Sequence, residues 1–548
     1  METNFLLIST AGVPKILSDF IPDIGLSVLA SSLMAEGHRV KILDFNQPSL
    51  YSEVFTDEIR KFLEGFSYRV FIEGKKPTFR QVLELKVIER KLEKNKVAFS
   101  RRLRNYVLEF VEREKIDCVG FKLWAGDGFR WSMEAGRYLK KRNPGLKVLG
   151  GGPQVDIFGQ EIFRVGEFFD ALCYGEGEET IKLLAGFVNG SERLPDIPNV
   201  IFRREDGSIV KTPRKFVEDL DTLPVPVYTP DVYPGIGEKL RMLVIEESRG
   251  CPNSCHFCIH PVKSGKRRAK SPARIVEEIR EYGRKYGVKL FKYAGSSTPA
   301  DLMVNVAKGI IAGGLNVRYT SFGHINDFDT DFRILKQSGC ESIFFGLESA
   351  DEEILKKGMN KNIDMAKARK VLQGCKEAGI FTVVSLIHPS PFETEKTREK
   401  TLEFMKEVRP DSVLVQFPGI YPGTQWFRSP ERFNFTLHDR ERYPLEMMTY
   451  QIKNLFPPRY WKPLPYTING MAFREFAGKT EKFQKDLQRE GIETSVSDEA
   501  YLLYGFSGFS SLNEFLNRNR CFFYSGNRKE LEAEIKNINR KVVNLTPS

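Results

Sequence analysis

The sequence has few cysteines and no long hydrophobic run. Eight cysteines in 548 residues are too few for a disulfide framework. No stretch of about 18 consecutive apolar residues occurs, so we expect no helix that spans a membrane. The first residues carry no basic segment before the apolar run at 5–8 and soon turn polar, so we expect no signal peptide. These absences predict a reduced, cytoplasmic protein.

Charge is nearly balanced as well. The chain has 83 Lys and Arg against 72 Asp and Glu, a formal net charge of +11. Spread over the whole length, this excess fits anionic small molecules or an acidic protein partner as well as nucleic acid. The composition, with 41% hydrophobic and 28% charged residues, is globular. At ~150 residues per domain, the length suggests about three to four domains.

The first part of the chain alternates short apolar runs with helical patterns. This alternation favours an α/β fold with a parallel, doubly wound, Rossmann-like sheet over residues 1–190. The predicted strands are 5–8, 40–43, 118–121, 148–149 and 171–174. Residues 50–115 interrupt the rhythm with a long charged helical pattern, which we predict to be an insertion over one edge of the sheet. Acids interleave with the bases there, so a solvated helix is favoured over a nucleic-acid arm.

A second α/β run follows a connector at 191–240. We expect a hairpin around Asp206 and Gly207 in that connector. Six strands with helices between them suggest a barrel or partial barrel over residues 241–430, with its chemistry on loops at the C-terminal strand ends. These strands are predicted at 242–245, 290–293, 317–322, 342–345, 382–387 and 412–417. Residues 431–548 lose the rhythm and are rich in aromatics, which predicts a small helical or α+β domain.

Three cysteines, Cys251, Cys255 and Cys258, form the sharpest motif. Their C-x3-C-x2-C spacing lies directly after the first barrel strand. Three thiolates on a short loop can bind three irons of a [4Fe–4S] cube and leave the fourth iron open. Zinc prefers four ligands, and His256 or His260 could supply the fourth, but no second C-x2-C pair exists. We therefore favour the cluster, and we expect the other five cysteines to pack as small hydrophobes.

The cysteine spacing resembles the signature of the radical S-adenosylmethionine (SAM) superfamily. The similarity continues through residues 293–297, 346–349, 388–394 and 421–424, so it covers about 240–428. It implies a partial (β/α)6 barrel, a [4Fe–4S] cluster on the three cysteines, and bound SAM. The SAM contacts it implies are Phe257, Gly295, Ser296, Glu348, Ser385 and, from the basic run 263–270, Arg268. His388 and Ser390 stand where the family pattern has glycines.

The strand ends of the first domain carry small and glycine-rich segments. Alone they fit a flavin, a nucleotide or no ligand. Joined to the cysteine loop, the order resembles the cobalamin-binding subclass of radical SAM enzymes. That resemblance implies cobalamin contacts from Ser9, Thr10, Gly150, Gly151, Gly152, Pro153, Tyr174, Gly175, Glu176, Gly177 and Glu178. The Asp-x-His-x-x-Gly motif of methionine-synthase-like domains is missing, which implies cobalamin bound without a histidine ligand.

The resemblance implies a cobalamin-dependent radical SAM methyltransferase. Such an enzyme uses methylcobalamin and a 5′-deoxyadenosyl radical to methylate an unactivated carbon, or phosphorus, of a small-molecule or natural-product substrate. We expect substrate contacts from residues 431–548, a flavodoxin or ferredoxin as reductant, and no nucleic acid. The alternatives are a B12-dependent cyclase or rearrangement enzyme, a tRNA methylthiotransferase, and a non-catalytic zinc protein. No catalytic residue is predicted, and His324 is expected to be a satisfied structural histidine.

Overall fold

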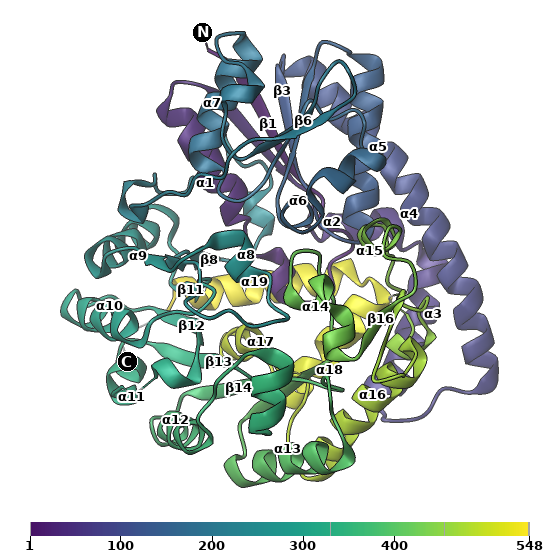
Figure 1. Cartoon of the computed structure of the whole chain (residues 1–548), viewed down its shortest axis with the longest axis vertical. Helices are drawn as coiled ribbons and strands as arrows, with labels where there is room; N and C mark the ends of the chain where they lie inside the picture. Colours follow the sequence, from purple (N-terminus) through teal and green to yellow (C-terminus); the bar gives the residue numbers. More distant parts are fainter. Residues whose placement is uncertain (1, 329, 454, 546–548) are drawn as a thin grey trace.

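The structure is a computed structural model that describes residues 2–545 except 329 and 454. Two sheets, one from each half of the chain, form the framework (Figure 1). The N-terminal sheet lies at the top of the view in Figure 1 and the second sheet at the lower left. The C-terminal helices, drawn in yellow, run between the second sheet and the long helix at the right.

The N-terminal sheet has seven strands in the order β2-β1-β3-β4-β5-β6-β7. The first five are parallel, which confirms the predicted doubly wound α/β fold. The predicted hairpin adds β6 and β7 antiparallel to this sheet, so part of the connector belongs to the first domain. The strands are β1 (Asn4–Ser9), β2 (Arg39–Asp44), β3 (Cys118–Lys122), β4 (Lys147–Gly151), β5 (Ala171–Cys173), β6 (Val200–Arg203) and β7 (Ile209–Lys211).

Helices cover both faces of this sheet. α1 packs with α7 on one face, and the long α4 packs along α5 on the other. Because β2 and β3 lie on opposite sides of β1, α4 lies in the crossover between them, within the stretch predicted to be an insertion. The helices are α1 (Ile24–Ala35), α2 (Ser49–Val54), α3 (Asp57–Ser67), α4 (Phe79–Arg113), α5 (Asp127–Arg142), α6 (Pro153–Phe158) and α7 (Glu178–Asn189).

One described segment, Leu17–Ala35, is long and apolar enough to cross a membrane by length and composition. It consists of a 3-10 turn, Leu17–Phe20, and α1, and 56% of its most apolar window is buried inside the protein. Ala30 and Leu33 of α1 are fully buried. The segment therefore packs as a core element of the first domain.

The second sheet has six parallel strands in the order β15-β14-β13-β12-β11-β8. In the part of the chain that the structure describes, the end strands β8 and β15 do not pair, so the barrel is partial, as predicted. Its strands are β8 (Met242–Ile245), β11 (Leu290–Tyr293), β12 (Arg318–Gly323), β13 (Cys340–Glu348), β14 (Phe381–Ile387) and β15 (Ser412–Gln416). The helices that follow them are α9 (Pro272–Tyr286), α10 (Ala300–Ala312), α11 (Phe332–Gln337), α12 (Met365–Glu377) and α13 (Glu395–Val408).

The residues after β15 do not form the single C-terminal domain that the sequence predicts. The segment up to α16 lies at the C-terminal ends of the barrel strands, where α15 contacts α6 of the first domain. α17 packs instead on β12, β13 and β14 from the opposite end, where Thr320 donates a hydrogen bond of 2.7 Å to Asp498. α18 packs on α3. The elements are α14 (Gln425–Arg428), β16 (Phe435–Leu437), α15 (Tyr443–Met448), β17 (Tyr466–Ile468), α16 (Phe473–Arg489), α17 (Asp498–Tyr504), α18 (Leu512–Ser525) and α19 (Arg528–Val543).

The placement expected of residues 431–548 therefore differs for those from α17 onward, residues 498–545. A helical pattern identifies an amphipathic helix but not the surface that it covers. Here α17 fills the N-terminal mouth of the barrel, away from the strand ends that carry the cysteine loop. Asn539 of α19 bonds the backbone of Lys239 and Arg241, which joins this helix to the connector. Of the described residues after β15, those before α17 lie at the C-terminal strand ends.

Candidate active site

The cysteine loop is closed at its base by a short antiparallel pair. β9 (Ser248–Arg249) pairs with β10 (Arg268–Ala269), so the two ends of the loop meet. Gly250 has a φ of +80°, and a Cβ there would lie 2.3 Å from the carbonyl oxygen of Lys266. Glycine is therefore required at the point where the two ends cross.

The three cysteines of the motif are free and half-buried. Burial raises the pKa of Cys255 to about 12 and raises the pKa of Cys258, and the nearby charges of the other two thiols add to the rise at Cys255. A cube spreads three thiolates over three irons, whereas zinc draws its ligands to one centre. The cysteine arrangement fits the cluster.

The two nearby histidines do not complete a zinc site. The ring of His256 packs 4.8 Å from that of Phe433, and its Nδ1 is buried without a hydrogen-bond partner. The Nδ1 of His260 lies 2.8 Å from the hydroxyl of Ser296. Ser296, a predicted SAM contact, is thus held beside the cysteine loop.

A buried ion pair lies between the predicted SAM residues and the thiols. Glu348, at the end of β13, accepts hydrogen bonds from Lys361 at 3.0 Å and from Ser385 at 3.3 Å. The structure thus brings Glu348 and Ser385 together. Lys361 lies 6.0 Å from the ring of Phe257, and its charge also reaches Cys255. Sequence reasoning missed Lys361, because no motif distinguishes it from the neighbouring lysines.

A second missed residue, Glu247, positions the loop that carries Gly295. Its fully buried carboxylate accepts hydrogen bonds from the backbone amides of Ala294 and Gly295, at 3.1 and 3.0 Å, and from the hydroxyl of Thr298 at 2.6 Å. Burial raises the pKa of Glu247. These bonds join the predicted glycine-rich SAM loop to the strand that leads into the cysteines. Its position after the first barrel strand was the one available signal.

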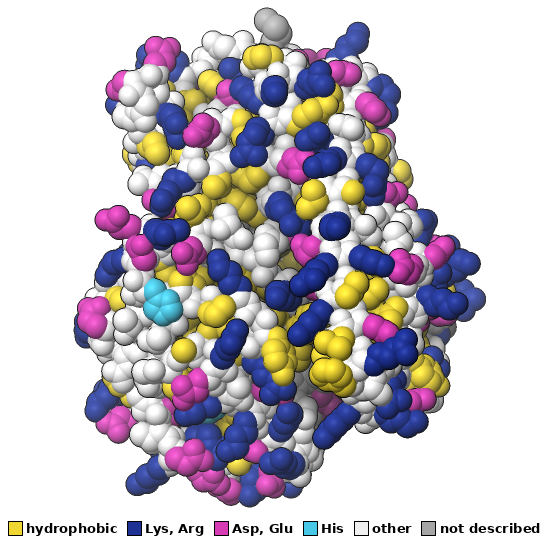
Figure 2. Space-filling model, turned by 90° about the vertical axis from the view of Figure 1, so that its right-hand side faces the viewer, with side chains coloured by type: hydrophobic (Ala, Val, Ile, Leu, Met, Phe, Trp, Pro, Cys, Tyr) yellow, Lys and Arg dark blue, Asp and Glu magenta, His cyan; other side chains and the backbone are white. Residues whose placement is uncertain are grey.

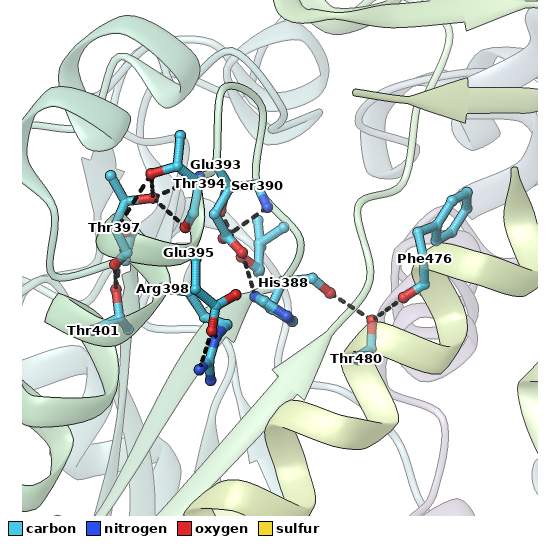
Figure 3. Close-up of polar contacts among 12 residues, drawn as sticks. His388, Ser390, Glu393, Thr394, Glu395, Thr397, Arg398, Thr401, Phe476 and Thr480 are labelled. Carbon is cyan, nitrogen blue, oxygen red and sulfur yellow. Dashed lines mark hydrogen bonds and ion pairs between the residues drawn. The ribbon is translucent and has the colours of Figure 1, made fainter. Parts of the chain in front are cut away.

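The loop after β14 turns its histidine away from the barrel interior (Figure 3). The Nδ1 of His388 lies 2.6 Å from Glu393, and its ring packs 4.4 Å from Phe483 of α16. Thr480 of α16 donates a hydrogen bond of 2.5 Å to the His388 carbonyl oxygen. Ser385, by contrast, points to Glu348. A histidine is compatible with a loop that resembles a glycine motif because its buried side chain packs between Glu393 and Phe483, away from the Ser385–Glu348 contact.

His324, after β12, differs from expectation. Its Nδ1 is buried without a hydrogen-bond partner, so it is not a satisfied structural histidine. Burial, assisted by the nearby charge of Lys361, lowers the pKa of His324 to about 4. A neutral imidazole therefore lies at the same strand ends as the Glu348–Lys361 pair.

Three residues predicted to contact cofactors, Arg268, Glu176 and Glu178, form ion pairs between the domains. Arg268 binds Glu176 through two bonds of 2.6 and 3.0 Å. Arg249 binds Glu178 through two further bonds, one of them 3.2 Å long. The four side chains are between 5% and 12% exposed, so each buried carboxylate is paired with a buried guanidinium group. This pairing could not be predicted from the sequence, because 92 residues separate Glu176 from Arg268.

The other predicted cobalamin residues lie at the C-terminal ends of three strands of the first sheet. Ser9 ends β1, Gly150 and Gly151 end β4, and the rest follow β1, β4 or β5 directly. Thr10 is turned toward α5, where its hydroxyl bonds the carbonyl oxygen of Gly128 at 3.0 Å. Ser9 accepts a hydrogen bond of 3.1 Å from the indole of Trp124. The strand order reverses between β1 and β3, and open α/β sheets bind ligands at that point. Trp124, which follows β3, is therefore a cofactor-contact candidate that sequence reasoning missed.

A basic groove lies on the outer face of the first domain. It has a volume of about 890 Å³ and runs along the exposed side of α5. Figure 2 shows the face that carries α4, with Lys and Arg side chains in dark blue along it. Among the groove residues are Arg104, Arg130, Arg137, Lys141 and Arg142. The groove is separate from the cysteine loop.

Comparisons with known proteins agree with this geometry. Residues 245–405 match the radical SAM superfamily, and residues 83–185 match the B12 binding domain. An uncharacterised methyltransferase of Pyrococcus horikoshii is 28% identical over 53% of this chain and 64% of its own length. An anaerobic magnesium-protoporphyrin IX monomethyl ester cyclase of Synechocystis is 25% identical over 53% of this chain and 59% of its own length. The chain thus spans less than two thirds of these two curated relatives.

A solved structure shows the same fold over the whole chain. It is the radical SAM methyltransferase TsrM from Kitasatospora setae with cobalamin and a [4Fe–4S] cluster bound. The TM-score is 0.65 at 16% identity, and the alignment covers 98% of this chain and 99% of TsrM. The fold and the cysteine site define a protein with a radical SAM domain. More particularly, this chain combines a radical SAM domain with a B12 binding domain, which confirms the predicted [4Fe–4S] cluster, SAM and cobalamin as its cofactors.

Proposed function

We propose that this protein is a cobalamin-dependent radical SAM methyltransferase that acts on a small molecule. The observation that carries the proposal is a contact between the two domains. Glu178, in the segment after β5, pairs with Arg249 at the base of the cysteine loop. Cofactors held at the C-terminal strand ends of the first sheet and at the cysteine loop would therefore lie close to one another. The methyltransferase names of the Pyrococcus relative and of TsrM support this assignment.

The residues of the chain bind and orient the cofactors. When bound, the cluster supplies an electron to SAM, and cobalamin supplies the methyl group. Cys251, Cys255 and Cys258 would hold three irons. The Glu348–Lys361 pair offers one carboxylate and one ammonium to the polar groups of SAM, in a buried site where such contacts are strong. Trp124 and the glycines after β4 offer a flat, close surface for cobalamin.

The electron donor and the product are also part of the proposal. A one-electron donor with an acidic surface, such as a flavodoxin or a ferredoxin, suits a chain with a net charge of +11. The methyl acceptor is a carbon or phosphorus atom of a small molecule or natural product. The segment between β15 and α17 lies at the strand ends and supplies its contacts.

A substrate is not needed for the first test. The protein is reconstituted anaerobically with iron, sulfide and hydroxocobalamin, reduced, and given SAM with a deuterated methyl group. We expect deuterated methylcobalamin, detected by mass spectrometry, in the native protein and in Cys375→Ser, a buried cysteine outside the motif. Bound cobalamin that remains unmethylated would overturn the proposal.

Ring closure is the second candidate, because the Synechocystis relative is named a cyclase. The mass of the product separates the two reactions. Methylation adds one methylene unit to the substrate, whereas oxidative ring closure removes hydrogen and adds no carbon. Substrate consumption without a methylene gain would favour the cyclase.

A further inference from the structure

Two ion pairs fix the cysteine loop to the first domain. Arg249 stands two residues before Cys251, and Arg268 stands at the other end of the same loop. The two arginines are paired residues of β9 and β10. Arg249 binds Glu178, and Arg268 binds Glu176, so both ends of the loop are held by one segment of the first domain.

The same segment, residues 175–178, lies at the C-terminal strand ends of the first sheet, where cobalamin is predicted to bind. It follows β5 directly, and Gly175 has a φ of +73°. The backbone amide of Gly175 donates a hydrogen bond of 2.7 Å to Asp156 of α6. Asp156 in turn lies 3.6 Å from the ammonium of Lys263, a residue of the cysteine loop. The Asp156–Lys263 contact is thus a third link between the strand ends of the first sheet and the cysteine loop.

These contacts are buried and largely saturated. Glu176 also accepts a hydrogen bond of 2.6 Å from the backbone amide of Val217, and Arg268 also donates to a carbonyl oxygen at Ser264. Arg249 is held from a second side by Glu246, at 2.6 Å. A buried, bidentate network moves as a unit, because separating one partner leaves an unpaired charge in the interior. A displacement of the segment after β5 is therefore transmitted to the cysteine loop.

We infer that the pairs Glu176–Arg268 and Glu178–Arg249 couple cobalamin binding, at the C-terminal strand ends of the first sheet, to the conformation of the cysteine loop. The four residues act as positioning residues: they order residues 250–267 when cobalamin is bound. This inference rests on the cobalamin binding in the proposed function. Two sites linked in this way have a coupling free energy, which is measurable without knowing the substrate.

Hydrogen exchange tests the coupling in the full chain carrying its cluster. Amide exchange of residues 250–267 is measured with and without saturating hydroxocobalamin. We expect hydroxocobalamin to slow exchange of this loop by roughly fivefold or more in the native protein, the lower end of typical coupling factors. In the double variant Glu176→Gln and Glu178→Gln, we expect less than a twofold change.

The matched control is Glu179→Gln, an exposed neighbour on α7. It should retain the native protection. Exchange of α12, distant in the chain from both pairs, reports whether the double variant is folded. The electron paramagnetic resonance spectrum of the reduced cluster gives a second readout, because a change of its line shape on adding hydroxocobalamin should disappear in the double variant.

The outcomes separate this inference from the proposed function. If native protein binds hydroxocobalamin and its loop exchange does not change, the inference is wrong while the proposed function stands. Equal protection in the double variant also overturns it. If the native protein does not bind hydroxocobalamin, the proposed function fails first. Should the double variant not fold, the single change Arg268→Lys, which keeps the charge but not the bidentate geometry, takes its place with the same expected loss.

Discussion

The ammonium nitrogen of Lys361 lies 3.0 Å from Oε1 of Glu348, and both side chains are only 8% exposed. Glu348 stands at a φ of +71°, at the end of β13, so its carboxylate is directed by an unusual backbone conformation. The pair connects the strand ends predicted to bind SAM with the cysteine loop. It is the polar centre of the proposed site.

Replacing Lys361 with methionine should weaken SAM binding. The change removes the buried ammonium and leaves the Glu348 carboxylate unpaired, so we expect a loss of about tenfold or more in affinity. Equilibrium dialysis of the cluster-loaded protein with SAM measures it. The control, Lys357→Met, removes an exposed lysine nearby and should leave the affinity unchanged. Equal affinities for the two variants would remove Lys361 from the site.

A methyl group at Gly250 should disrupt the cysteine loop. Alanine there would place its Cβ against the Lys266 carbonyl oxygen and requires a positive φ, a combination that costs about 1–3 kcal/mol or forces the loop open. We expect less iron and sulfide per chain after anaerobic reconstitution. Gly237→Ala, at a position with open space around it, should bind the native amount. Full iron content in Gly250→Ala would show that the loop ends do not cross as described.

Trp124 should contribute to cobalamin binding. Its indole bonds Ser9 at the point where the strand order reverses. Trp124→Phe removes this hydrogen bond and part of the flat surface, so we expect a several-fold weaker affinity for hydroxocobalamin, equivalent to about 1 kcal/mol. Absorbance titration measures it. Trp461→Phe, which loses a comparable bond to Phe456, is the control and should bind as the native protein does.

Stability should fall with rising pH through a group at the opposite end of the barrel. Burial raises the pKa of Asp498 to about 7, and Glu499 beside it pairs with Lys292. The folded protein therefore holds this proton more tightly than the unfolded chain does. Its stabilisation is complete below about pH 4 and is lost as the pH rises to about 7, by at most about 4 kcal/mol.

Thermal unfolding between pH 5 and pH 8 tests this dependence. Asp498→Asn should raise the melting temperature more at pH 8 than at pH 5, because the amide carries no charge at either pH. The exposed change Glu352→Gln should shift it equally at both. A constant difference between Asp498→Asn and the native protein would contradict the protonated carboxyl group.

The sequence predicted those parts of the structure that have a local pattern. Alternating apolar runs located the strands of both sheets, and the cysteine spacing located the loop. Glu348 came from a motif at a strand end, and it lies in contact with Ser385, another residue that the family resemblance implied. Arg268 was recognised as a functional arginine, but its pairing with Glu176 was not predicted, because 92 residues separate the two in the chain.

Tertiary packing determined the rest. The sequence of α17 has an ordinary amphipathic pattern. In the fold, this helix fills the N-terminal end of the barrel, where Asp498 accepts a hydrogen bond from Thr320. Lys361 is one lysine in a charged segment, and only the fold turns it inward. Buried pairs between distant segments leave no periodic signal in a single sequence.

The central claim is that one chain holds the cluster and cobalamin close together, where the C-terminal strand ends of its two sheets face each other. The most direct test is electron paramagnetic resonance of anaerobically reconstituted protein containing cob(II)alamin, recorded with the cluster oxidised and then reduced. The account predicts both signals in one chromatographic peak, and faster relaxation of the cob(II)alamin signal when the cluster is reduced. Cob(II)alamin that binds with unchanged relaxation, or protein that emerges without cobalamin, would contradict it.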